Sequence, residues 1–308
     1  MRVAVMGAGG MGGYFGGLLA NAGHHVTFIA RGAHLEALRR EGGIHLRTVQ
    51  GEIFARADAV DAAPAVPTDL ILFTVKSFDT PAAAEALRPA VGSETAILSL
   101  QNGVANEEVL AGLYGAGRVL GGIVYMLATI HAPGVIEQTG GPRTLILGEW
   151  RGGPSERVSR WEALMKQAGI LARASDDVVR DKWVKFTFIC ASAGMTSLTR
   201  LPIGEIRASP PAWAMFRQIM EEVVAVGRAR GVPLTNQVVE DHMAFAGKLE
   251  PHIRTSMYHD LAHGRRLELD ALHGAAIRYG REAGVPTPMC EAIYAALALH
   301  DARAQRGP

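Results

Sequence analysis

The first half of the chain alternates short apolar runs with turn residues and helical patterns. The runs read RVAVMG, HVTFIAR, DLILFTVK, TAILSL and RVLGGIV. Because helical spacing follows most of these runs, the alternation predicts βαβ units and a parallel sheet. Two later runs, GVIEQ and TLILGEW, are separated by TGGPR, and we expect them to form a hairpin that adds to the same sheet.

The second half of the chain shows almost no strand pattern. From Asp176 onward apolar residues recur at helical spacing. We expect helices over residues 177–199, 210–230, 235–248, 255–263, 268–283 and 287–301, interrupted by RLPIG, RGVPLT and AGVPTP. The sequence therefore predicts an α/β domain over residues 1–175 and an all-helical domain over residues 176–308, with an active site in the cleft between them.

Composition narrows the functional class. A chain of 308 residues with 48% hydrophobic and 20% charged residues is typical of a folded protein, and its length favours two domains. The net charge of +1 provides no basic surface for nucleic acid. No signal peptide precedes the first strand, and the stretch VLGGIVYMLATI is too short to cross a bilayer, so we expect a cytoplasmic protein without membrane contact. Cys190 and Cys290 are expected to be buried thiols.

A glycine-rich loop joins the first strand to the first helix. Gly7, Gly9 and Gly12 form the pattern G-x-G-x-x-G. The first glycine permits the tight turn, the second lets the backbone approach a pyrophosphate, and the third lets helix and strand pack closely. The loop therefore predicts a Rossmann-type dinucleotide-binding domain, although a purely structural turn is the alternative. The residues expected to contact the cofactor are Gly7, Ala8, Gly9, Gly10, Met11 and Gly12.

The end of the second strand bears on cofactor choice. Sites that prefer NAD usually carry an acidic residue here for the ribose 2′-hydroxyl, whereas an arginine suits the 2′-phosphate of NADP. The segment FIARGAHL has no acidic residue and contains Arg31. We therefore expect NADPH as the cofactor. The alternative is that Arg31 is a surface arginine in a loop without a role in binding.

Several polar residues occupy positions where a ligand site is expected. Lys76 and the segment QNG, which contains Asn102, follow two apolar strands, and each could equally be an exposed strand end or turn. Lys185 lies within the apolar helix DKWVKFTFICASAG, where it either extends to the surface or points into a cavity, while Lys182 is expected to reach solvent. Ser256 and Glu268 follow later, and the first turn of a helix is itself a favourable place for Glu268.

Taken together, these residues resemble the ketopantoate reductase (2-dehydropantoate 2-reductase) family over essentially the whole chain. The shared features are the glycine loop, the arginine after the second strand, TVK, LQNG, a helix with W-x-K and a segment SM-x-x-D…GR-x-x-E. The resemblance implies a C-terminal domain like that of 6-phosphogluconate dehydrogenase. It also implies NADPH-dependent reduction of ketopantoate to pantoate, a step of pantothenate and coenzyme A biosynthesis.

The resemblance also implies roles for individual residues. Lys185 corresponds to the family's general acid, which protonates the oxygen as hydride reaches the C2 carbon. Glu268 corresponds to a catalytic glutamate that binds substrate and positions the lysine. Ser256 corresponds to a further substrate contact, and Lys76 and Asn102 to residues that lie between nicotinamide and substrate.

One departure from the family affects the substrate. The family helix usually carries asparagines four and eight residues after the lysine, where this chain has Ile189 and Ala193. A related reductase of another 2-oxoacid, similar to opine dehydrogenases, is therefore an alternative. A non-catalytic NADPH-binding sensor is a further alternative, against which the presence of Lys185 and Glu268 argues. We expect a small 2-oxoacid as the substrate and neither nucleic acid nor a membrane as a partner. A homodimer is possible, but the sequence does not decide the oligomeric state.

The histidines of the helical domain suggest a further kind of site. His259 and His263 stand one helical turn apart, but no acidic ligand accompanies them, so no metal is expected. His273 could line the pocket or be packed in the core.

Overall fold

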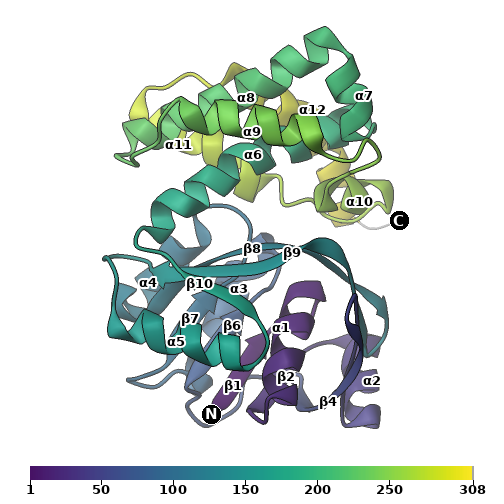
Figure 1. Ribbon diagram of the computed structural model, residues 1–308, viewed down its shortest axis with the longest axis vertical. Helices are drawn as coiled ribbons and strands as arrows, with labels where there is room; N and C mark the ends of the chain where they lie inside the picture. The colour runs from purple at the N-terminus through teal and green to yellow at the C-terminus, as the bar shows by residue number, and fades with distance from the viewer. Residues whose placement is uncertain (307–308) are drawn as a thin grey trace. The chain divides into compact units, whose positions relative to one another are not determined.

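The predicted parallel strands pair in the computed structural model, which describes residues 1–306 (Figure 1). β1 (Arg2–Met6) lies between β2 (His25–Ile29) and β6 (Leu70–Phe73), and β7 (Ala96–Ser99) and β8 (Val119–Ala132) follow β6 in the sheet. All four of these pairings are parallel, and β6 and β7 are buried throughout. Strands covered on both faces form such continuous apolar runs.

Helices connect these strands. They are α1 (Gly10–Asn21), α2 (Gly32–Glu41), α3 (Thr80–Ala86), α4 (Asn106–Tyr114) and α5 (Glu156–Gln167), with short 3₁₀ turns at Ser77–Asp79, Arg88–Ala90 and Ala116–Arg118. Helix α1 packs on the sheet through its buried glycines, and α5 packs on β9 and β10. The α/β class and the Rossmann-type domain are confirmed.

The sheet has strands that the sequence did not predict. The additional strands are β3 (Gly43–Thr48), β4 (Gly51–Arg56), β5 (Asp58–Val60) and β10 (Leu171–Ala174). With them the sheet has ten strands in the order β4-β3-β9-β8-β7-β6-β1-β2-β5, and β10 pairs with β9. Three to six residues with many polar positions give too weak an alternation to identify a strand from sequence.

The predicted hairpin at TGGPR was wrong. A single strand, β9 (Val135–Glu149), runs through this segment, and the turn lies earlier, between β8 and β9, where Gly134 has φ 80°. β8 and β9 pair antiparallel with register shifts near Tyr125 and Leu127. The glycines at 140 and 141 form part of this irregular pairing, since Leu127 pairs with Gly140 and Gly141 has φ 81°.

The second half of the described chain is helical, as predicted. Its helices are α6 (Val178–Thr199), α7 (Ile203–Ala208), α8 (Pro210–Ala229), α9 (Gln237–Lys248), α10 (Ser256–Ala262), α11 (Ala275–Ala283) and α12 (Pro288–Arg306) (Figure 1). The short α7 was missed because it starts directly after the proline of RLPIG. The helix expected over 268–283 begins instead as a π-helical turn, Asp270–Gly274. Trp183, Phe186 and Phe216 belong to the core of these helices.

The chain divides into two compact units. The sheet unit comprises Met1–Gln101 and Asn106–Val178, and the helical unit comprises Asn102–Ala105 together with the residues from Val179 onward. The four-residue segment 102–105 therefore belongs with the helices although it lies within the predicted first domain. Across residues 1–306, no helix combines the length and apolar character that a membrane span requires.

Candidate functional site

The glycine loop has the geometry that its sequence predicts. Gly7 has φ 100°, a conformation that side chains other than glycine rarely adopt. The Thr74 hydroxyl donates to the Gly7 carbonyl oxygen at 2.6 Å and lies 3.1 Å from that of Met6, so the end of β6 fixes the loop. A Cβ atom on Gly12 would collide with the Gly7 carbonyl, whereas one on Gly9 would meet nothing within 4 Å. The loop is therefore closely packed at Gly12, whereas the space beside Gly9 is open.

A cavity of about 390 Å³ lies beside this loop. Its lining includes Gly7, Ala8, Gly9 and Arg31, four of the residues expected to contact a cofactor. Gly10, Met11 and Gly12 form the first turn of α1, which has no acidic residue and begins at Gly10. Backbone N–H groups at a helix N-terminus are suited to phosphate. The cavity, its glycine rim and the helix start therefore fit a dinucleotide.

Two carboxylates that the sequence did not indicate share this cavity with Arg31. Asp61 and Asp79 are part of its lining, and the Arg31 guanidinium lies 3.2 Å from the Asp79 carboxylate. The Arg31 side chain is 84% exposed, so the ion pair contributes little stability. Asp79 was missed because 48 residues separate it from Arg31 and only the fold brings them together. Lys76 starts the 3₁₀ turn that carries Asp79 and is partly buried, but it does not line this cavity.

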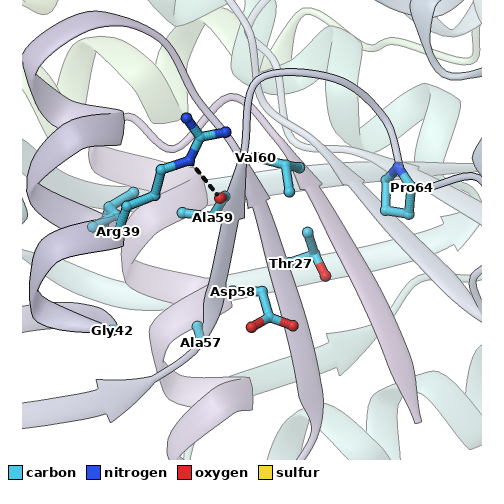
Figure 2. Close-up of a pocket in the computed structure, with 9 residues that line it drawn as sticks. Thr27, Arg39, Gly42, Ala57, Asp58, Ala59, Val60 and Pro64 are labelled. Atoms are coloured by element: carbon cyan, nitrogen blue, oxygen red, sulfur yellow. Dashed lines mark hydrogen bonds between the residues drawn. The ribbon is translucent and has the colours of Figure 1, made fainter.

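A second cavity, of about 400 Å³, lies at the β5 edge of the sheet unit. Figure 2 shows the Arg39 side chain above it, with Nε donating to the Ala59 carbonyl oxygen at 3.1 Å, and the Asp58 carboxylate among the lining groups. None of the predicted site residues lines it. The glycine loop distinguishes the first cavity as the candidate nucleotide pocket.

In the helical unit, Lys185 and Asn102 come together as a candidate active-site pair. The Lys185 ammonium donates to the Asn102 side-chain oxygen at 3.1 Å. The loop of Asn102 fits against the helices because Gly103 has φ 90° and has no room for a side chain beside Ala271. Val104 is buried in the same core as the helices. Lys185 itself is partly buried, so it does not extend freely to the surface, and Asn102 is a polar partner for its ammonium.

Burial and, to a smaller extent, the nearby ammonium of Lys182 lower the pKa of Lys185 to about 7, although the Glu268 carboxylate acts to raise it. The expectation that Lys182 reaches solvent was wrong, since only 4% of it is exposed. One helical turn before Lys185, it adds positive charge to this part of α6. A lysine with a pKa near neutrality can hold and release a proton at physiological pH.

Glu268 is held in place through its backbone. It is buried, and the neighbouring Leu267 N–H donates to the Asp301 carboxylate of α12 at 2.6 Å. The Leu272 N–H donates to the Glu268 carbonyl oxygen at 3.1 Å, which links Glu268 to the π-helical turn. Three predicted site residues are therefore connected: Lys185 donates a hydrogen bond to Asn102, and the charge of Glu268 acts on the pKa of Lys185.

Ser256 lies at the exposed start of α10, and no described contact joins it to Lys185. Its neighbour Thr255 caps the helix by accepting from the Tyr258 N–H, and the hydroxyls of Thr255 and Thr196 lie 2.9 Å apart. The start of α10 is thus attached to the C-terminal half of α6.

The two positions that depart from the family pattern differ in exposure. Ile189 is partly exposed on α6, whereas Ala193 is 2% exposed and packed in the core. Ser192 is also buried, and its hydroxyl donates to the Ile189 carbonyl oxygen at 3.4 Å. Only Ile189 presents its side chain beyond the core.

The histidines of this unit are placed differently from one another. His273 is fully buried, with its Nε2 3.0 Å from the Cys190 carbonyl oxygen, and burial lowers its pKa to about 4. His259 and His263 are exposed. Among residues 1–306, no group of three or more His, Cys, Asp or Glu side chains could hold a metal ion. Cys190 and Cys290 are buried free thiols, as predicted.

Comparisons with known proteins extend over almost the whole chain. The family model described as ketopantoate reductase PanE/ApbA matches residues 3–152, and the model of its C-terminal domain matches residues 177–301. The 2-dehydropantoate 2-reductase of Mesorhizobium japonicum is 32% identical, with 96% of each chain covered. The crystal structure of a PanE/ApbA family ketopantoate reductase from Ralstonia eutropha JMP134 is 35% identical, with a TM-score of 0.91 over 99% of this chain and 100% of the other.

The fold is shared with a more distant enzyme. A ternary structure of D-mandelate dehydrogenase with NADH and anilino(oxo)acetate superposes with a TM-score of 0.90 at 21% identity, over 99% of each chain.

Proposed function

Because the chain belongs to the ketopantoate reductase family, a family of oxidoreductases, we propose that it reduces a 2-oxoacid to the 2-hydroxyacid with NADPH, and that ketopantoate is one substrate. The observation that carries the proposal is the partly buried Lys185, hydrogen-bonded to Asn102 and under the electrostatic influence of Glu268. A protein that only sensed the cofactor would need the glycine loop but no such proton donor.

The cavity beside the glycine loop supports a dinucleotide cofactor. Gly7, Ala8 and Gly9 would hold the pyrophosphate with the N–H groups that start α1, and Arg31 would pair with the 2′-phosphate of NADPH. When bound, the nicotinamide supplies the hydride. The NADH complex of the D-mandelate dehydrogenase, which shares this fold, is consistent with a nicotinamide cofactor.

The remaining chemistry belongs to residues of the helical unit. As hydride reaches the C2 carbon, negative charge grows on the carbonyl oxygen, and the Lys185 ammonium stabilises that charge and gives its proton to the oxygen. The Asn102 oxygen accepts from the ammonium and orients it, while the Glu268 carboxylate favours the protonated form. Oxoacid, NADPH and one proton thus become hydroxyacid and NADP⁺.

The partly exposed Ile189 favours a second candidate, a reductase whose preferred 2-oxoacid is less polar than ketopantoate. The experiment that tests both is NADPH oxidation with a series of 2-oxoacids that includes ketopantoate. We expect turnover with ketopantoate, and absence of turnover with every 2-oxoacid would refute the proposed function.

A further inference from the structure

The face of α6 that carries Lys185 continues with apolar side chains. Phe188 and Ile189 follow the lysine by three and four residues, the spacings that place helical side chains beside one another. Both are partly exposed, although each also packs against the core of the helical unit. The proton donor therefore has apolar surface next to it along the helix.

A ring from another helix extends this surface. Phe245 of α9 packs edge-on against Phe188, with ring centroids 5.3 Å apart, and the residue is 52% exposed. On its other side Phe188 packs against the buried Phe216, with ring centroids 6.2 Å apart. Phe188 is thus packed between a core ring and a ring that remains accessible.

Helix α9 is fixed to the part of α6 that carries Lys185. The His242 ring lies 5.4 Å from the Phe188 ring, and its Nε2 lies 2.8 Å from the Val184 carbonyl oxygen, one residue before Lys185. Burial lowers the pKa of His242, so the ring is uncharged near neutral pH and adds no cation to the apolar surface.

We propose that Phe188, Ile189 and Phe245, together the aromatic wall, bind the C3 substituent of the substrate and select 2-oxoacids with an aromatic or branched apolar tail. The inference rests on the proposed function, because Lys185 must hold the carbonyl oxygen. Four helical residues, about 6 Å along the axis, separate Lys185 from Ile189, and a tail attached next to the carbonyl spans that length. Burying a phenyl ring there removes apolar surface of both partners from water.

The test compares two substrates with the same reacting group and different tails. With saturating NADPH we expect kcat/KM to be about 10–100-fold higher for phenylpyruvate than for pyruvate, the effect of burying one large apolar group. Phe245→Ala should lower that ratio about 5–20-fold. Because Phe245 is half exposed, the variant is expected to fold, and Phe188→Leu provides a second variant that retains an apolar side chain against Phe216.

The matched control is Leu299→Ala, which removes an exposed apolar side chain from α12 and should leave the ratio unchanged. Turnover of pyruvate or ketopantoate without preference for phenylpyruvate would overturn the aromatic wall while leaving the proposed function intact. The aromatic wall would also be overturned if Phe245→Ala lowered kcat/KM equally for phenylpyruvate and pyruvate. If the protein reduced none of phenylpyruvate, pyruvate and ketopantoate, that result would instead contradict the proposed function.

Discussion

Lys185 is an amine whose pKa the protein has brought close to neutrality. Burial is the first cause, and the positive charge of Lys182 one turn earlier is the second. The sequence alone showed that a lysine lies within an apolar helix, but it could not show its partner, because Asn102 lies 83 positions away. The burial of Lys182 was not predictable either, because it depends on segments that only the fold brings against α6.

We predict that the rate of 2-oxoacid reduction falls as pH rises through about 7. In the proposed mechanism the Lys185 ammonium donates the proton, and its protonated fraction declines above its pKa of about 7. Lys182→Met removes a neighbouring positive charge, so the midpoint should move to higher pH, and Glu268→Gln should move it to lower pH. The measurement is kcat/KM for the 2-oxoacid against pH at saturating NADPH, because kcat/KM reports the pKa of the enzyme before the oxoacid binds. A midpoint that stays the same in both variants would show that another group controls the profile.

Arg31 is predicted to set cofactor preference. A charge-assisted contact contributes about 1.5–3 kcal/mol, so Arg31→Ala should weaken NADPH binding by one to two decades and NADH binding much less. The Asp79 carboxylate competes for the same guanidinium and repels a phosphate, so Asp79→Asn should strengthen NADPH binding. Fluorescence titration of both cofactors gives the two affinities. Equal losses for NADPH and NADH in Arg31→Ala would remove Arg31 from this role.

Two elements of the helical unit are fitted together at His273. His273 lies on the π-helical turn Asp270–Gly274 and faces α6. Its ring is hydrogen-bonded to the Cys190 carbonyl oxygen and lies against Gly194. A Cβ atom on Gly194 would collide with the ring. The contact joins α6, which carries Lys185, to the segment that carries Glu268.

Gly194→Ala should therefore lower the free energy of unfolding by about 1–3 kcal/mol, the usual cost of overpacking. His273→Ala removes the ring and should relieve that clash, so the double variant should be more stable than the sum of the single effects predicts. Denaturant unfolding of the four proteins measures this coupling. If the two changes in the free energy of unfolding were strictly additive, the alanine side chain at position 194 would not clash with the His273 ring.

Elements with strong periodicity were predictable, and those with little periodicity were not. The buried runs of β1, β6 and β7 and the long helices α6, α8 and α12 carry clear patterns, and the structure confirms them. The edge strands β4 and β5 alternate weakly, and the glycines of β9 suggested a turn inside one continuous strand. The π-helical turn has no sequence signal that differs from an α-helix, so Glu268 was placed on an ordinary helix.

For the molecule as a whole, the sequence predicted the order of a nucleotide-binding half and a helical half, and the family matches to residues 3–152 and 177–301 agree with that order. It did not predict that segment 102–105 belongs with the helices, because that depends on the packing of Val104 in their core. This placement brings Asn102 to Lys185.

The central claim is that Lys185 donates the proton in an NADPH-dependent reduction of a 2-oxoacid. The direct measurement is kcat for NADPH oxidation with ketopantoate in the wild-type protein and in Lys185→Met, together with the NADPH affinity of each. Methionine keeps the length and fits an apolar helix, so folding and NADPH binding should be nearly unchanged while kcat falls about 10²–10⁴-fold. Turnover of the variant at a rate close to that of the wild type would contradict the claim.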